Sequence, residues 1–193
     1  MDKLKQQIEF ILEIDKMKNI YRQSYITDGL RHENDAEHSW HLALMVMVLR
    51  EYFDEDTDTL KVIKMVLIHD LVEIYAGDTY LYDEKGYEDK AKREQEAADK
   101  LFGRLPEEQK NEFMELWHEF EAKDTKESRF AAVLDRLQPV LLNYSTKGKA
   151  WLEHGIPYEK VRQKQKDVFN GPKEIAEFLD ELLKDAVSKG YIK

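Results

Sequence analysis

The sequence contains no cysteine, and it has little glycine or proline. Its 193 residues include 8 Gly and 4 Pro, which is few for strands joined by tight turns. The absence of cysteine excludes disulfides, thiolate metal ligands and a thiol nucleophile. The low content of glycine and proline favours a chain built from helices.

Long apolar runs and net positive charge are also missing. No run approaches the roughly 18 residues of a membrane-spanning helix, and no signal-type apolar block follows the first five residues. A formal net charge of −10 repels nucleic acid and anionic lipid. We therefore expect a cytoplasmic protein with neither a nucleic acid polymer nor a membrane as partner. A local arginine or a metal could still attract a small anion.

Helical spacing of apolar residues runs through nearly the whole chain, in which 42% of the residues are hydrophobic and 36% are charged. The length suits one domain spanning 1–193, with an all-α fold. Asp35 is expected to cap a helix, and Pro139 is expected to kink one. The expected helices cover residues 4–17, 35–53, 59–75, 87–103, 106–122, 126–146, 157–168 and 172–188, with longer loops at 18–34, 77–86 and 147–156.

One apolar segment carries ionisable groups that need a partner. In "VLIHDLVEIYAGD", residues 66–78, His69 and Asp70 stand side by side in a stretch that otherwise suits a buried helix. His69 and Glu73 are four residues apart, so they share a helix face. Imidazole and carboxylate are ligands of divalent first-row metals. By itself the segment leaves two interpretations open: metal ligands, or a histidine satisfied by a hydrogen bond in the core.

Two further segments bear on that choice. "ENDAEHSWHLALM" (33–45) places His38 near the start of an apolar helix, and "AAVLDRLQPVL" (131–141) places Asp135 inside another. Aspartate is a poor residue for the interior of an apolar helix, so Asp135 either faces solvent or is buried for a reason. In the buried case three helices would each offer ligands, namely His38, His69 with Asp70, and Asp135.

The order His, His-Asp, Asp resembles that of the HD-domain metal-dependent phosphohydrolases. The strings "ENDAEHSWH", "HDLVEIYAGD", "LWHEFEAKDTKESRF" and "LDRL" resemble the 5′-deoxynucleotidase-like subgroup of that family. The similarity runs from about Arg22 to Asn143. It implies an HD-domain helical bundle with a mononuclear metal site at its centre.

The resemblance also implies a ligand set. One divalent ion would be held by His38, His69, Asp70 and Asp135, with open positions for water and a phosphate oxygen. Mn, Co, Fe, Ni, Zn and Mg all remain open as the identity of the metal.

Three more residues match functional positions of the family. Glu73 would orient or deprotonate a water. Asp78 would donate a proton to the departing 5′-oxygen or bind a sugar hydroxyl, and Arg22 would clamp the phosphate. Each also has an ordinary structural interpretation: a surface acid at a helix end, a turn residue after a glycine, and a solvated arginine in a loop.

Other polar residues near these motifs have functional or structural interpretations. Glu37 either holds the imidazole of a ligand histidine or caps its helix, and His41 is expected in the core or behind a ligand. Residues 147–156 either help to recognise a base or phosphate, or form an anchored surface loop. The stretch 117–120 is expected to pack and support. Structural or surface positions are expected for His32, His118 and His154.

The predicted function is hydrolysis of (deoxy)nucleoside 5′-monophosphates to nucleoside and phosphate by an enzyme that forms a homodimer. A module that binds a nucleotide without turnover is one alternative. An HD-fold di-iron oxygenase is another, but it needs additional histidines between the His-Asp pair and the last aspartate. Only His118 lies there.

Overall fold

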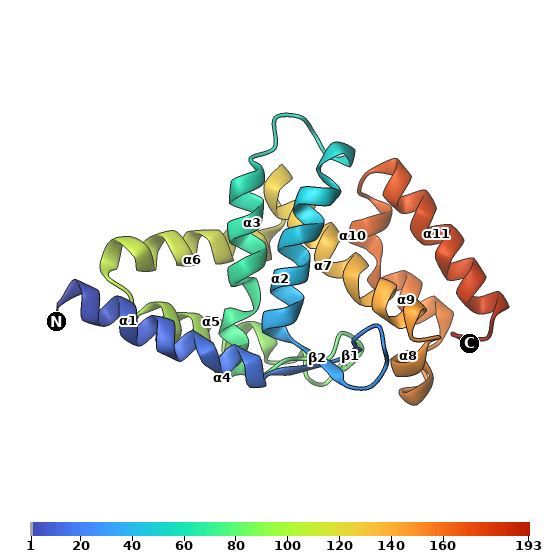
Figure 1. Cartoon of the computed structure of the whole chain (residues 1–193), viewed down its shortest axis with the longest axis horizontal. Helices are drawn as coiled ribbons and strands as arrows, with labels where there is room; N and C mark the ends of the chain where they lie inside the picture. The colour runs from blue at the N-terminus through green and yellow to red at the C-terminus, as the bar shows by residue number, and fades with distance from the viewer. Residues whose placement is uncertain (1) are drawn as a thin grey trace.

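Helices account for most of the chain, and one small sheet precedes α2 (Figure 1). The computed structural model describes residues 2–193. The all-α fold class predicted from the sequence is confirmed. Within the described residues, no helix has both the length and the apolar character needed to cross a membrane. The elements are α1 Lys3–Ile14, η1 Asp15–Asn19, β1 Tyr21–Tyr25, β2 His32–Asn34, α2 Asp35–Val48, η2 Arg50–Tyr52, α3 Thr59–Ile68, η3 His69–Val72, α4 Glu73–Ala76, α5 Lys90–Phe102, α6 Glu107–Ala122, α7 Lys126–Ser145, α8 Lys149–Glu153, α9 Tyr158–Lys164, α10 Lys166–Phe169 and α11 Lys173–Ser188.

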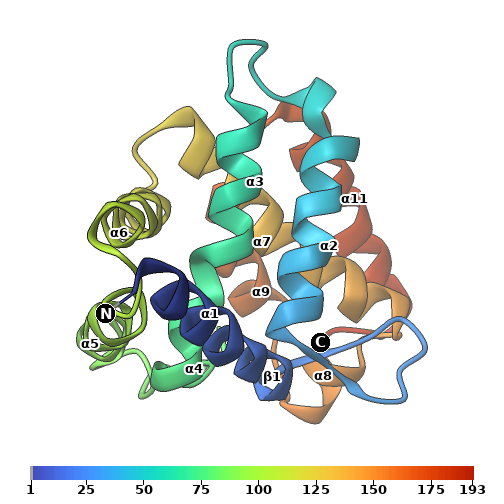
Figure 2. The same cartoon turned by 60° about the vertical axis from the view of Figure 1, so that its left-hand side comes forward.

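The long helix α7 lies at the centre of the fold. Twelve of its twenty residues are buried, and α2, α3, α6 and α10 pack against it. In the view of Figure 2, α7 runs behind α2 and α3. Phe130 and Leu134 are among its fully buried side chains, and each such residue stabilises the fold by about 1.5–3 kcal/mol. Because α7 is surrounded on several sides, several of its polar residues are buried, among them Ser128, Gln138 and Asn143.

The first two strands form an antiparallel hairpin where the sequence predicts a loop over 18–34. Tyr25 pairs with His32 across this hairpin. The loop prediction is wrong because two short polar strands show no apolar alternation, and their pairing depends on backbone hydrogen bonds and on side-chain contacts such as that between the rings of Tyr25 and His32. The hairpin matters for the site because β1 carries Arg22, whose side chain is largely buried.

The predicted helix over 59–75 is interrupted where the candidate site residues lie. The 3-10 turn η3 takes over from α3 at His69, and α4 begins at Glu73. The prediction of one continuous helix is therefore wrong. At the interruption the His69 ring lies 3.0 Å from the Val66 carbonyl oxygen, a side-chain contact with the end of α3 that apolar spacing does not reveal.

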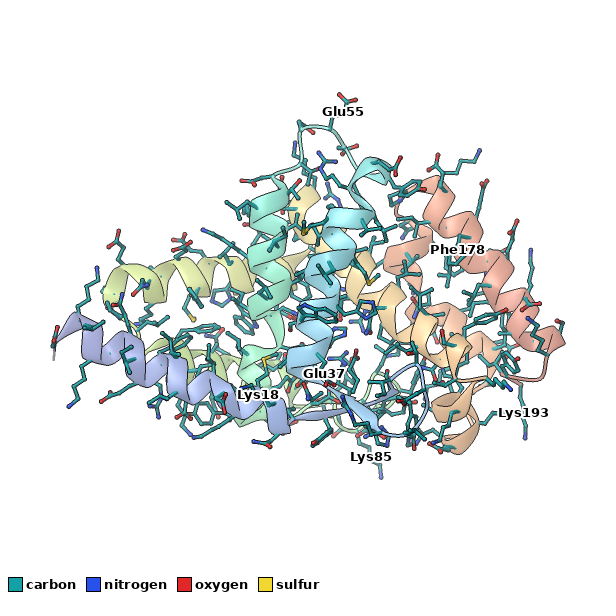
Figure 3. All side chains as sticks on the ribbon, in the orientation of Figure 1. Lys18, Glu37, Glu55, Lys85, Phe178 and Lys193 are labelled. Atoms are coloured by element: carbon teal, nitrogen blue, oxygen red, sulfur yellow. The ribbon has the colours of Figure 1, made fainter. Side chains whose placement is uncertain are left out.

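The cap of α2 also differs from the prediction. Asn34, not Asp35, caps the helix: its side chain accepts from the Glu37 N–H at 3.0 Å, and the Glu37 carboxylate accepts from the Asn34 N–H at 3.2 Å. Figure 3 shows Glu37 at the lower end of α2, where its carboxylate also pairs with Arg31. Of the two interpretations of Glu37, capping therefore holds, and Asp35 is free to point inward.

Three smaller boundaries differ from the expected pattern. The expected loop at 147–156 contains the short helix α8, and the expected helix over 157–168 divides into α9 and α10 at Gln165. The helix expected from residue 87 begins at Lys90. Pro139 lies inside α7, which continues on both sides of it, and the kink expected there stays a prediction.

Candidate metal centre

Residues from three elements meet at one point in the core. His38 comes from α2, His69 from η3 and Asp135 from α7, and one potential ligand atom of each lies within 4.8 Å of the others. Asp135 Oδ1 is 3.1 Å from His38 Nε2 and 3.7 Å from His69 Nε2. The structure therefore brings together three predicted ligand residues that are far apart in the sequence.

The outer nitrogens of both imidazoles show which way the rings are set. His38 Nδ1 lies 3.1 Å from Gln138 Oε1, and His69 Nδ1 lies 3.0 Å from the Val66 carbonyl oxygen. Both oxygens can only accept, so a neutral ring carries its hydrogen on Nδ1. The Nε2 lone pairs then face the space beside Asp135 Oδ1.

Such an arrangement of lone pairs and carboxylates fits a cation. His69 Nε2 is buried and has no hydrogen-bond partner among residues 2–193. Two imidazole nitrogens and a carboxylate around one point form a donor set that suits a divalent first-row metal. A bound cation would satisfy the orphaned nitrogen and offset the cost of burying the carboxylate.

Asp70, the fourth predicted ligand, lies at the edge of the cluster. Its Oδ2 is 3.2 Å from His69 Nε2 and 3.9 Å from His38 Nε2. The same oxygen accepts a hydrogen bond from Arg22 Nη1 at 2.6 Å. The carboxylate is therefore within reach of the other three groups but is held by the guanidinium.

The charges around the cluster favour a positive species at its centre. Burial by itself lowers the pKa of His69, but the carboxylates of Asp70 and Asp135 outweigh burial and raise this pKa to about 10. Burial raises the pKa of Asp135, but Arg136 and the two histidines outweigh it and hold that pKa well below its usual range. The cluster thus attracts positive charge, which either a proton or a metal ion can supply.

A cleft of about 340 Å³ opens beside the cluster and contains the other predicted site residues. Glu73 is buried, and its Oε2 has no hydrogen-bond partner within the described chain. Burial and the negative charge of Asp70 raise the pKa of Glu73 to about 10, and burial also raises the pKa of Asp78. Both acids therefore bind protons more readily than ordinary surface carboxyls. Among the residues that line the cleft are Arg22, His69, Asp70, Glu73, Asp78 and Asp135.

Arg22 is the cation that balances these acids. Its Nη1 donates to Asp35 Oδ1 at 3.1 Å and to Asp70 Oδ2 at 2.6 Å, and lies 3.9 Å from Asp78 Oδ1. Its Nε has no hydrogen-bond partner in the part of the chain that the structure describes. The interpretation of Arg22 as a solvated arginine in a loop is therefore wrong, because the hairpin buries it among carboxylates.

Sequence reasoning missed three buried polar residues next to the cluster: Glu33, Asp35 as a core group, and Gln138. Gln138 follows Asp135 by three residues, a helical spacing that places it on the same face, but no contact with a ligand was predicted for it. No comparable spacing marks Glu33 or Asp35, because the hairpin that carries Glu33 was not predicted. Two basic residues of the cleft wall were also missed, namely Lys90 and Arg136.

The other predicted residues are placed mainly by packing. Phe120 is buried, and its ring centroid lies 4.7 Å from that of His69, so the packing predicted for 117–120 holds for Trp117 and Phe120. His118 is exposed on α6. In 147–156, Lys149 donates to the Gly29 carbonyl and covers a tyrosine ring of β1, whereas Trp151 is buried and lines the cleft.

A helical fold with a buried His-Asp cluster beside a cleft is typical of helical domains that can hold a metal ion. The chain belongs to one family of this class, the HD domain family, whose model matches residues 14–176. The resemblance inferred from the sequence motifs is thereby confirmed.

Several relatives carry names that bear on function. The chain is 28% identical over 135 residues to the human 5′-deoxynucleotidase HDDC2, a match that covers 69% of this chain and 65% of the human protein. It is 29% identical over 172 residues to the 5′-deoxynucleotidase HDDC2 of Dictyostelium discoideum, covering 86% of this chain and 90% of that protein.

A solved structure is similar over almost the whole fold. It is the crystal structure of a predicted metal-dependent phosphohydrolase from Magnetospirillum magnetotacticum MS-1, which is 47% identical in sequence. The two superpose with a TM-score of 0.94, and the match covers 98% of this chain and 95% of the other.

Proposed function

We propose that this protein is a metal-dependent phosphohydrolase that converts (deoxy)nucleoside 5′-monophosphates to nucleoside and phosphate. The observation that carries the proposal is the convergence of two imidazole nitrogens and Asp135 on one point, in a cleft that also contains Arg22. The names of the relatives support a nucleotide as substrate.

We propose that His38, His69, Asp70 and Asp135 hold one divalent ion. The donor set suits Mn, Co, Fe, Ni or Zn, and Mg is a harder alternative. When bound, the ion would supply Lewis acidity, which acidifies a water and withdraws charge from a phosphoryl oxygen. Each remaining part of the reaction falls to the protein's own side chains.

Arg22 would bind the substrate phosphate. It now shares its Nη1 between Asp35 and Asp70. Once Asp70 serves as a ligand, the guanidinium keeps Asp35 as its anchor and has donors left for phosphate oxygens. The planar fork of arginine suits this task, and its Nε already lacks a partner among the residues described.

Glu73 and Asp78 would handle protons and water. Glu73 is buried beside the cluster. A bound cation would favour its ionised form against the burial and the charge of Asp70 that raise its pKa, and the carboxylate could then orient the attacking water and accept its proton. Asp78 follows Gly77, whose φ of +78° turns the chain at the end of α4. The raised pKa of Asp78 suits a group that donates a proton to the departing 5′-oxygen, and hydrogen bonding to a sugar hydroxyl is the alternative role.

The cleft also offers apolar surface for the nucleoside. Tyr80 and Tyr82 line it, with ring centroids 5.2 Å apart, and Trp151 lines it from α8. Aromatic rings of this kind can stack on a base. A small nucleotide as substrate also agrees with the cytoplasmic location expected from the sequence.

The test is phosphate release from a panel of deoxyribo- and ribonucleoside 5′-monophosphates. Metal-stripped protein would receive Mn²⁺, Co²⁺, Mg²⁺ or Zn²⁺, with Asp70→Ala as the control variant. We expect metal-dependent release that the variant lacks. Tight nucleotide binding without release would instead support the sensing module. Two metal ions per chain would revive the di-iron alternative.

We further propose that the protein forms a homodimer through α2 and α3. The two helices pack side by side (Figure 2) and leave large apolar side chains exposed on their outer surfaces. Each of these side chains is between 41% and 71% exposed, and a group of exposed apolar side chains of this kind marks an interaction surface. A second copy would cover the same face on each partner. The exposed side chains are Trp40, Leu44, Met47, Val48, Leu60 and Leu67.

A further inference from the structure

The helix α7 contacts both ring nitrogens of one histidine. Asp135 Oδ1 lies 3.1 Å from His38 Nε2, and Gln138 Oε1 lies 3.1 Å from His38 Nδ1. Asp135 and Gln138 are three residues apart, so they lie on nearly the same face of the helix. Gln138 and His38 are both fully buried, so water cannot replace this contact.

The direction of the Gln138 amide is itself fixed. Its Nε2 donates to Glu33 Oε1 at 2.6 Å and lies 3.2 Å from His41 Nδ1. A carboxylate can only accept, so the NH₂ group of the amide faces Glu33 and its oxygen faces His38. The chain Glu33–Gln138–His38 therefore has one consistent assignment of donors and acceptors.

We propose that Gln138 is a positioning residue that keeps the Nε2 lone pair of His38 available for the metal, and that Glu33 keeps Gln138 in place. This inference rests on the ligand set in the proposed function. Gln138 acts through His38 and reaches neither the substrate nor the metal. Glu33 lies beside both residues: its Oε1 accepts from Gln138, and its Oε2 is 3.6 Å from His38 Nδ1 and 3.9 Å from Arg22 Nε.

Gln138 would prevent one competing state of His38, the tautomer that carries its hydrogen on Nε2. His38 Nε2 and Asp135 Oδ1 are 3.1 Å apart, which is a good distance for an N–H···O hydrogen bond. A neutral ring with its hydrogen on Nε2 would donate to Asp135, and two ligands of the metal would then bind each other instead. Gln138 disfavours this tautomer because its oxygen needs a donor from Nδ1.

The test is a Co²⁺ titration of metal-stripped protein without any nucleotide, followed by calorimetry and by the visible absorption of the bound ion. Gln138→Leu removes the acceptor, and we expect the dissociation constant to rise by about 10–100-fold. Ser128→Ala is the matched control, because Ser128 is buried on the same helix and caps its first turn. It should lower the melting temperature and leave Co²⁺ affinity unchanged.

Exchanging the side chains of Glu33 and Gln138 gives a sharper test. Gln138→Glu alone puts two buried carboxylates in contact and should weaken Co²⁺ binding as well. Adding Glu33→Gln restores a donor opposite the new carboxylate, so the double variant should bind Co²⁺ within about threefold of the wild type. Rescue of this kind is not expected of a residue that only fills space, and it decides the question even if Gln138→Leu does not fold.

Three results would overturn the inference. One is a Gln138→Leu protein that binds Co²⁺ as tightly as the wild type, and another is a double variant that is no better than Gln138→Glu. The third is wild-type protein that binds no Co²⁺, which would also remove the proposed ligand set. Wild-type protein that binds Co²⁺ but hydrolyses no nucleotide would overturn the proposed substrate alone and leave the role of Gln138 standing.

Discussion

Replacing Arg22 by methionine should destabilise the protein strongly and in a pH-dependent way. The guanidinium donates to Asp35 at 3.1 Å and to Asp70 at 2.6 Å. Asp35 is completely buried, so the variant would leave a carboxylate in the core without its cation. Removing one partner of a buried ion pair costs about 3–5 kcal/mol of unfolding free energy.

The sign of the pH dependence follows from the pKa of Asp35. Burial and the nearby charge of Asp70 raise this pKa to about 7, although Arg22 lowers it. The folded state therefore binds more protons than the unfolded state between roughly pH 4 and 7, and the contribution of Asp35 to stability falls as pH rises through that window. Without Arg22 the pKa rises further, so the stability loss of the variant should be larger at pH 8 than at pH 5.

The assay is urea unfolding of metal-stripped protein at pH 5 and pH 8. Arg31→Met is the matched control, because Arg31 also pairs with a carboxylate, that of Glu37, but on the exposed surface. Its loss should be about 0–1 kcal/mol at both pH values. A loss for Arg22→Met no larger than that of the control, or one equal at both pH values, would refute the reasoning.

Three further predictions concern the metal, the chemistry and the assembly. Asp70→Ala should lose both bound metal and phosphate release, as measured by metal analysis after gel filtration and by a phosphate assay. Glu73→Gln should keep its metal but lower kcat by about 10²–10⁴-fold, because only the proton acceptor is lost; an unchanged kcat would exclude that role. Leu44→Asp should convert a dimer to a monomer in light scattering. The control Phe178→Asp, which changes a similarly exposed apolar residue on α11 (Figure 3), should not.

Periodicity of apolar residues predicted the helices that bury one face. The expected helices over 106–122, 126–146 and 172–188 correspond closely to α6, α7 and α11. Periodicity missed the hairpin β1–β2 and the turn η3, because both are decided by hydrogen bonds rather than by apolar spacing. The hairpin needs backbone pairing between two strands. In η3 the side chain of His69 contacts the carbonyl oxygen of Val66 in the preceding helix.

The residues of the candidate site also fall into two groups, those that the sequence motifs predicted and those that they did not. Motif spacing brought His38, His69 and Asp135 to notice, and the structure places them together. The surroundings of these residues were not predictable, because Glu33 and Gln138 lie 105 residues apart in the sequence and meet only in the folded core. Local patterns identify the residues that a motif carries, whereas the groups that orient them depend on the tertiary fold.

The distance along the chain between members of the cluster has a consequence for how the protein is made. His38 on α2 and Asp135 on α7 are 97 residues apart in the sequence. During synthesis the cluster cannot assemble until α7 has left the ribosome and packed against α2 and α3. Contacts over such long sequence separations form late in folding, because closing the loop between them costs entropy first. Completion of the cluster therefore reports that α2, η3 and α7 have packed together, and cation binding during refolding should appear after the first phase.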